Sequence, residues 1–317
     1  MGEFELIREV FYRGPSRQAR LGIGDDCALL DTKKTLAVSS DMLLAGRHFL
    51  PNAEPYSIGY KSLAVNLSDL AAMGAQPLAF TLAIALPSSD PVWLKAFAKG
   101  LFAVADRYHC ELIGGDTTRT PSGGPLTISI TVMGELRHDG LRRSAAQPGD
   151  HIWVSGTLGG PARALSWLLG DAELTGAATD DAIKRLHEPE PRVELGLALQ
   201  HLARAAIDIS DGLIGDLGHI CEQSRLRADL DVSKLPLATA LAGLSTQEQL
   251  GYALAGGDDY ELCFTADPSN RQAIEALEVS LGLPLTLIGR MQEGQGVHCA
   301  DENGRPVTQD FKSFEHF

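Results

Sequence analysis

Apolar residues follow helix or strand spacing over most of the first half of the chain. Residues 57–73 place three leucines on one face, which predicts a buried helix. A second helix is predicted over residues 91–108. The apolar run between these two segments, residues 78–86, is short enough to be a strand of the core.

Other strands of the first half are expected to end in polar residues. The segment 36–41 has the pattern of a strand whose last three residues are polar. A strand at residues 111–113 is followed by a glycine-containing turn at 114–119 and by a further strand over residues 126–133. A short helix is also predicted at residues 4–12.

The second half has the same mixture of elements, and it begins at the turn Pro148-Gly149-Asp150. Because this turn precedes a predicted strand at residues 151–155, we expect one domain over residues 1–148 and a second over residues 149–317. The pattern therefore predicts an α/β protein of two domains. Helices are expected near residues 193–203 and 213–221, and strands at residues 260–265 and 285–289.

The composition is that of an ordinary globular protein. The 317 residues suffice for two domains with large cores, with 44% hydrophobic and 21% charged residues. The nearly uncharged stretch from Leu78 to Pro87 is too short to span a bilayer, and the N-terminus lacks a signal pattern, so we expect a cytoplasmic protein. The five cysteines include no CxxC pair, which favours reduced thiols over a disulfide framework or a zinc site.

The net charge of −14 argues against nucleic acid or an anionic membrane surface as the main partner. A nucleotide is also an anion, so an acidic protein that binds ATP needs divalent cations between its carboxylates and the phosphates. The positions of the aspartates therefore decide what chemistry is available.

Five short acidic clusters stand out, and four of them lie at predicted turns or strand ends. Carboxylates at such positions can point at one place from different elements, and oxygen ligands suit Mg²⁺ better than zinc or copper. Taken singly, each cluster is more typical of a turn or a helix cap. Together they favour a metal site; the clusters are Gly24–Asp26, Ser39–Asp41, Asn66–Asp69, Gly114–Asp116 and Asp208–Gly212.

Asp69 is the most informative of these aspartates because it lies inside the predicted apolar helix 57–73. An unpaired carboxylate there would cost several kcal/mol or become protonated, so Asp69 requires a cation or a hydrogen-bonded partner. A bond to a backbone amide or to a lysine at the helix edge is the alternative to a metal ion.

The cluster Asp208–Gly212 comes directly before a predicted helix. Free amides and the Ser210 hydroxyl at a helix N-terminus can face a phosphate while Asp208 and Asp211 hold metal, although a simple helix cap would have the same sequence. The chain has no GxxxxGK[ST], GxGxxG or His-Arg-Asp motif, so phosphate binding is expected from another type of fold.

Five longer motifs occur in order along the chain: Gly22–Leu30, Ala64–Gly74, Leu112–Arg119, Ile207–Ile214 and Gly256–Cys263. Together they resemble the thiamine-monophosphate kinase family, within the wider aminoimidazole-ribonucleotide-synthetase-like superfamily. The match extends nearly from end to end, and several motifs in a fixed order are more specific than any one of them.

This resemblance implies ATP as co-substrate, several Mg²⁺ ions, and a homodimer in which the N-terminal halves pair into a strand barrel with active sites near the interface. The fold it implies is the two-domain α/β fold of the superfamily. By the family pattern the magnesium ligands are expected to be Asp26, Ser39, Ser40, Asp41, Asp69, Asp116, Asp208 and Asp211.

The family pattern also implies contacts with the two substrates. ATP is expected to touch Gly115, Asp116, Arg143 and Ser210, and thiamine monophosphate is expected to touch His48, Asp258 and Phe314. The family's usual Gly-Gly-Glu-Asp-Tyr-Glu is Gly-Gly-Asp-Asp-Tyr-Glu here, so Asp258 is one methylene shorter than the expected glutamate. A solvated basic residue is the alternative for Arg143, and a structural role is the alternative for His48.

We expect direct in-line phosphoryl transfer without a general base, because the acceptor phosphate is already ionised at neutral pH. The nearest rivals are other ATP-dependent members of the superfamily, such as aminoimidazole-ribonucleotide synthetase or selenophosphate synthetase. A non-catalytic nucleotide sensor or maturation scaffold is the rival from a different class.

Overall fold

The computed structural model describes residues 3–23, 27–174, 176–307 and 311. The chain divides into two compact units, one of residues 1–70 and 75–137, the other of residues 71–74 and 138–317. The first unit thus ends at Arg137, eleven residues before the boundary that the turn at Pro148 suggested. Within the described residues, no helix is long and apolar enough to cross a membrane.

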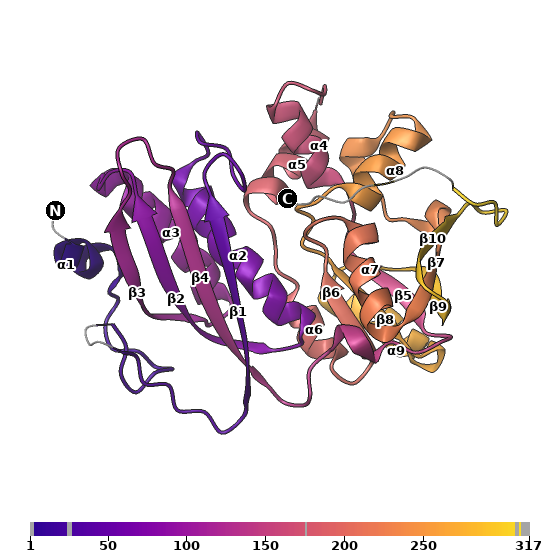
Figure 1. The fold of residues 1–317 in the computed structure, drawn as a ribbon, viewed down its shortest axis with the longest axis horizontal. Helices are drawn as coiled ribbons and strands as arrows, with labels where there is room; N and C mark the ends of the chain where they lie inside the picture. Colours follow the sequence, from indigo (N-terminus) through magenta and orange to yellow (C-terminus); the bar gives the residue numbers. More distant parts are fainter. Residues whose placement is uncertain (1–2, 24–26, 175, 308–310, 312–317) are drawn as a thin grey trace. The chain divides into compact units, whose positions relative to one another are not determined.

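The first unit is built on a four-stranded mixed sheet with the strand order β1-β4-β2-β3 (Figure 1). Strand β4 lies between β1 and β2 and is antiparallel to both, whereas β2 and β3 run parallel. Strands β1 and β3 are therefore the two edges of this sheet. The strands are β1 (Thr35–Leu44), β2 (Gln76–Leu86), β3 (Glu111–Arg119) and β4 (Thr127–Leu136).

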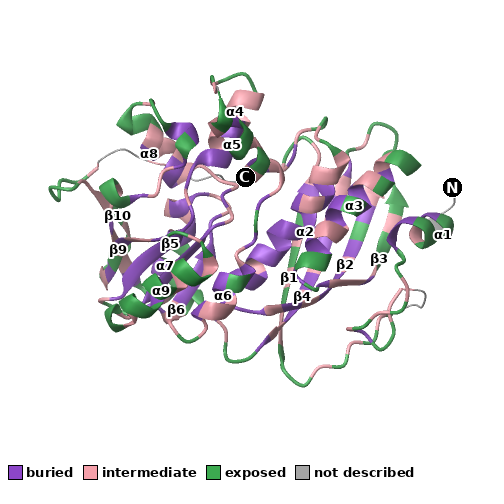
Figure 2. Cartoon of the chain, turned by 180° about the vertical axis from the view of Figure 1, so that it is seen from behind, coloured by how far each residue is buried: buried purple, intermediate pink, exposed green. Residues whose placement is uncertain are grey.

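Helices α2 (Pro55–Ala72) and α3 (Pro91–Arg107) cover one face of this sheet, behind it in Figure 1 and in front of it in Figure 2. They cross in very close contact through two glycines. A Cβ added to Gly59 would lie 2.0 Å from the carbonyl oxygen of Phe97, and one added to Gly100 would lie 1.8 Å from that of Tyr56. Only glycine permits this approach at both positions.

The opposite face of the sheet, which we call the outer face, carries the alternate residues of each strand. On β1 these are Val38, Ser40 and Met42, and the two apolar side chains are 61% and 56% exposed. In the strand register, Met42 pairs with Ser129 of β4, Ser129 pairs with Ala83 of β2, and Ala83 pairs with Asp116 of β3. Asp116 is therefore on the outer face, whereas the intervening β1 residues Ser39 and Asp41 are on the helix-covered face.

The second unit contains a six-stranded sheet with the order β10-β7-β9-β5-β8-β6 (Figure 1). The strands are β5 (His151–Ser155), β6 (Ala203–Asp208), β7 (Leu226–Asp231), β8 (Leu262–Ala266), β9 (Leu285–Glu293) and β10 (Gly296–Ala300). Ile152 and Val154 point into a core shared with Leu217 and Ile220 of one helix. By alternation, Trp153 faces the other side.

The remaining helices pack around the two sheets. All five cysteines are free thiols, as the absence of a CxxC pair predicted. The N-terminal helix is α1 (Glu3–Leu6), continued by a π-helical turn Ile7–Phe11. The helices of the second unit are α4 (Gly160–Leu168), α5 (Ala177–His187), α6 (Val193–Leu199), α7 (Leu213–Ser224), α8 (Thr246–Ala255) and α9 (Arg271–Leu281).

Two sequence-based expectations about strand ends were wrong. Strand β1 continues to Leu44, so Ser39, Ser40 and Asp41 lie within the strand rather than at its polar end. The predicted turn at residues 114–119 is the second half of β3, paired with β2. Gly115 makes that pairing possible, because a Cβ there would lie 1.9 Å from the carbonyl oxygen of Leu82.

Candidate functional site

Asp69 and Ser39 form a direct hydrogen bond between α2 and β1. The Ser39 hydroxyl donates to Asp69 Oδ2 at 2.5 Å. A carboxylate in an apolar helical segment requires a cation or a hydrogen-bonding partner, and this hydroxyl from a strand is such a partner for Asp69. Asp69 remains partly exposed beside it.

The asparagine of the same motif attaches α2 to the edge of β1. The N–H of Asp41 donates to Asn66 Oδ1 at 3.1 Å, and Asn66 Nδ2 donates to the Ser62 carbonyl one helical turn earlier at 2.9 Å. Asn66 is completely buried. It fixes the backbone at Asp41 relative to the helix that carries Asp69, so the two predicted magnesium ligands are held by one scaffold.

Asp41 lies level with Gly115, the residue before Asp116, so Asp41 and Asp116 are on opposite edges of the four-stranded sheet. The register runs from Asp41 through Ile130 of β4 and Leu82 of β2 to Gly115 of β3. Three strand spacings separate the edges, a distance of roughly 14 Å. Within the part of the chain that the structure describes, no three His, Cys, Asp or Glu side chains come together closely enough to hold a metal ion.

His48 has a defined orientation at the end of β1. Its Nδ1 accepts a hydrogen bond from the N–H of Leu44 at 3.0 Å. Because Nδ1 is an acceptor, the neutral ring carries its proton on Nε2.

In the second unit, Asp208 is the last residue of β6, and the following loop, which carries Ser210 and Asp211, is joined by backbone hydrogen bonds to the loop that carries Asp258. Asp258 N–H donates to the Ser210 carbonyl at 2.8 Å, and Tyr260 N–H donates to that of Ile209 at 2.8 Å. The structure thus brings two predicted magnesium ligands and one predicted substrate contact together. Asp258 has a left-handed backbone with a φ of 67°, a conformation that aspartate tolerates better than most residues.

A buried carboxylate that the sequence analysis missed supports this loop from within. Asp216 Oδ2 accepts hydrogen bonds from the N–H groups of Ser210, Asp211 and Gly212. The expectation that free amides of this segment face a phosphate is therefore wrong for these three, because Asp216 already occupies them. Burial raises the pKa of Asp216 to about 7, although the backbone N–H bonds oppose that shift.

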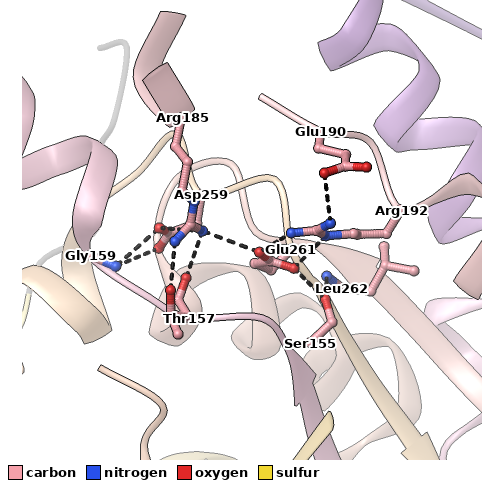
Figure 3. Close-up of polar contacts among 9 residues, drawn as sticks. All are labelled: Ser155, Thr157, Gly159, Arg185, Glu190, Arg192, Asp259, Glu261 and Leu262. Atoms are coloured by element: carbon pink, nitrogen blue, oxygen red, sulfur yellow. Dashed lines mark hydrogen bonds and ion pairs between the residues drawn. The ribbon is translucent and has the colours of Figure 1, made fainter. Parts of the chain in front are cut away.

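The Asp258 loop is held by a second buried carboxylate, Glu261, which has no exposed surface (Figure 3). Arg192 binds it with two hydrogen bonds, of 2.7 Å from Nε and 2.6 Å from Nη2. Arg185 adds a third at 3.1 Å, and the Ser155 hydroxyl adds a fourth at 2.6 Å. These bonds tie the loop to β5 and to the segment after α5.

Asp259, the residue after the predicted substrate contact Asp258, is buried and points toward Gly159 (Figure 3). Both of its oxygens lie 3.0 Å from the Gly159 nitrogen. Burial raises the pKa of Asp259 well above the ordinary value, and the nearby Arg185 lowers it in part. The glycine run 156–160 is thus bound by a carboxylate at Gly159.

The other predicted residues are placed as follows. Arg143 is exposed in a 3-10 turn, and its carbonyl accepts from Ser224 at the end of α7 opposite to the Ser210 loop. Gly115 and Asp116 are exposed on β3, and Ser40 bonds to Thr131 at 3.0 Å. Asp26 and Phe314 lie outside the described residues.

Two domains of a known protein family match most of the chain. Residues 24–136 match the family of AIR synthase related protein, N-terminal domain, and residues 147–301 match AIR synthase related protein, C-terminal domain. Thiamine-monophosphate kinase of Escherichia coli (strain K12) is 47% identical over 323 residues, which cover 100% of this chain and 98% of that protein.

Two solved structures are also similar over nearly the whole chain. Thiamine-monophosphate kinase from Stenotrophomonas maltophilia K279a is 48% identical with a TM-score of 0.83, and the match covers 92% of this chain and 93% of that one. AaThiL complexed with AMPPCP and TMP is 32% identical with a TM-score of 0.78, and the match covers 93% and 92% of the two chains.

Proposed function

The chain belongs to the thiamine-monophosphate kinases of the AIR synthase related family, and from this premise we propose that it transfers the γ-phosphoryl group of ATP to thiamine monophosphate. The product is thiamine diphosphate. The observation that carries the proposal is the hydrogen-bonded pair of loops that brings Asp208, Asp211 and Asp258 together in a protein similar over its full length to these kinases.

The proposed role of the aspartates is to bind magnesium. Carboxylate and hydroxyl oxygens are the donors that Mg²⁺ prefers, and the Ser39–Asp69 pair and the Asp208–Asp211 loop both supply them. Bound Mg²⁺ would neutralise the repulsion between the two anionic phosphates. The proposed ligands are Asp26, Ser39, Ser40, Asp41, Asp69, Asp116, Asp208 and Asp211.

In this proposal the protein side chains contribute to catalysis by positioning the substrates and by their charge, and they transfer no proton. The acceptor oxygen belongs to an ionised phosphate, so no residue is assigned as a general base. Gly115, Asp116, Arg143 and Ser210 are the proposed contacts of ATP. His48 Nε2–H, Asp258 and Phe314 are the proposed contacts of thiamine monophosphate.

We also propose a homodimer, because one copy separates ligands that a single site requires. Asp41 and Asp116 lie on opposite edges of the sheet, roughly 14 Å apart. Pairing β1 of one copy with β3 of a second would bring the two edges together. The exposed Val38 and Met42 on the outer face would then be covered inside a barrel made of the two sheets.

The proposed location is the cytoplasm, where ATP is available as co-substrate. The experiment that tests the function is ADP release by the purified protein with MgATP and thiamine monophosphate, free thiamine or no acceptor, together with detection of thiamine diphosphate. Product from the monophosphate alone supports the kinase. Tight MgATP binding with no turnover on any acceptor would contradict the kinase and favour a sensor or a different superfamily substrate.

A further inference from the structure

Asp216 lies directly beneath the loop that carries Ser210 and Asp211. It is 4% exposed and belongs to the first turn of α7. A single oxygen, Oδ2, accepts N–H groups from three consecutive residues: Ser210 at 3.0 Å, Asp211 at 3.1 Å and Gly212 at 3.2 Å. Three successive amides that converge on one atom fix the backbone of this loop at every residue they involve.

The carbonyl side of the same loop is fixed by different partners. The Ile209 and Ser210 carbonyls accept from Tyr260 and Asp258, and the Ile209 N–H donates to the Glu261 carbonyl, each at 2.8 Å. The loop is thus held between a buried carboxylate and a second loop. These backbone groups are engaged inside the protein, whereas the side chains of Ser210 and Asp211 are partly exposed.

Two glycines make this arrangement possible. Gly212 has a φ of 116°, and a Cβ there would lie 2.8 Å from the carbonyl carbon of Ala255. A Cβ on Gly257 would lie 2.5 Å from the Ser210 carbonyl oxygen. The loop therefore has little room to adopt another backbone conformation while its neighbours stay in place.

We propose that Asp216 is a positioning residue for magnesium binding, which holds residues 210–212 in the conformation that presents Asp208 and Asp211 together. This inference rests on the proposed role of Asp208 and Asp211 as magnesium ligands. Groups that orient metal ligands through hydrogen bonds typically contribute roughly 10–100-fold to metal affinity or activity. Asp216 acts through its hydrogen bonds to the loop amides. Its effect on magnesium binding therefore depends on the acceptor oxygen more than on the negative charge of the carboxylate.

Two variants of Asp216 distinguish the effect of its hydrogen bonds from the effect of its negative charge. Asp216→Asn keeps an oxygen that can accept the three N–H groups, whereas Asp216→Ala removes every acceptor. With ADP release measured against Mg²⁺ concentration, Asp216→Ala should raise the Mg²⁺ needed for half-maximal activity by roughly 10–100-fold and recover kcat at saturating Mg²⁺. Asp216→Asn should stay close to the parent protein. Equal impairment of both variants would overturn the geometric role.

Asp150→Ala is the matched control. Asp150 is also a fully buried aspartate of the second unit, and it accepts the Gln147 N–H at 2.9 Å and pairs with Arg204. Its loss should lower the Tm without changing the Mg²⁺ requirement. If Asp216→Ala does not fold, Asp216→Leu, which keeps a branched side chain of similar size and also has no acceptor, carries the same expected increase in the Mg²⁺ requirement.

Amide hydrogen exchange in the absence of Mg²⁺ tests the loop without any assay of activity. Asp216→Ala should speed exchange at residues 210–212, and unchanged exchange or an unchanged Mg²⁺ requirement would overturn the inference. Asp211→Asn serves to test the proposed function separately. If Asp211→Asn has the parent Mg²⁺ requirement, the metal-ligand role fails, and exchange at residues 210–212 alone then decides whether Asp216 positions the loop.

Discussion

Ser39 on β1 donates its hydroxyl hydrogen to Asp69 on α2, with 2.5 Å between Oγ and Oδ2. The bond joins an edge strand to the helix that covers the sheet. It gives a carboxylate in an otherwise apolar helical segment a fixed direction, toward the strand that carries Asp41. We propose this pair as a preformed part of the magnesium site.

The first prediction concerns this pair. Asp69→Asn should abolish turnover and leave a folded protein, because the amide keeps the size of the side chain and removes the anionic oxygen proposed to bind magnesium. ADP release and thermal unfolding measure the two properties. Ser62→Ala, which removes a hydroxyl bound 2.7 Å from the Ile58 carbonyl inside the same helix, should keep its activity. Normal turnover by Asp69→Asn at ordinary Mg²⁺ would remove Asp69 from the site.

The second prediction uses the positions of Asp41 and Asp116 on opposite edges of the sheet. If each site takes β1 from one copy and β3 from its partner, Asp41→Asn and Asp116→Asn are each inactive as homodimers. Unfolding and refolding the two variants together should restore about a quarter of the parent activity, because half of the dimers are mixed and each of these has one intact site.

The control for this experiment is a mixture in which both copies carry Asp116→Asn, which should stay inactive after the same treatment. Sedimentation or size-exclusion measurements establish that the refolded chains are dimers. Absence of any restored activity in a proven mixed dimer would mean that each site is formed within one copy, against the proposed pairing of edge strands.

The third prediction concerns Asp258 and its left-handed backbone. Asp258→Asn keeps a residue that tolerates a φ of 67° and removes only the charge, so the folded state should retain its stability. Loss of one charged hydrogen bond should raise the KM for thiamine monophosphate roughly 10-fold, with the KM for ATP unchanged. Steady-state kinetics with each substrate varied in turn provide the measurement. An unchanged KM for thiamine monophosphate excludes Asp258 from the substrate site.

The fourth prediction concerns the buried pair of Arg192 and Glu261. Removing one partner leaves an incompletely compensated carboxylate in the interior, so Arg192→Ala should lower the free energy of unfolding by about 3 kcal/mol. Arg271→Ala breaks an exposed Arg–Glu pair with Glu275 and should cost at most about 1 kcal/mol. Urea unfolding of both variants measures the difference, and equal small losses would show that the buried pair contributes no more than a surface one.

Much of the fold could be predicted from the sequence where spacing is regular. The expected strand at residues 151–155 is β5, and the expected helix at residues 91–108 matches α3 within one residue. Periodicity failed for residues 114–119, because two glycines and an aspartate are typical of a turn. Their pairing with β2 depends on the partner strand, which the local sequence does not contain.

The candidate site was predicted in part. The hydrogen bond from Ser39 gives the Asp69 carboxylate the partner that an apolar helix required. Asp216 and Glu261 were not predicted, because their roles depend on contacts formed only in the folded chain. Asp216 binds amides just outside its own helix, and Glu261 binds two arginines about 70 residues away in the sequence. The sequence feature that could have indicated such a role is a single acidic residue in an apolar stretch, such as Asp216 between Ile214 and Leu217.

The close crossing of α2 and α3 sets a limit on how this enzyme can be made more heat-resistant. Replacing helical glycines by alanine is a common route to a higher Tm, worth about 0.4–1 kcal/mol where the backbone allows it. At Gly59 and Gly100 the same change would force apart the helix that carries Asp69 and its neighbour. Gly218 in α7 and Gly251 in α8, where an added Cβ meets nothing within 4 Å, are the positions that engineering should use instead.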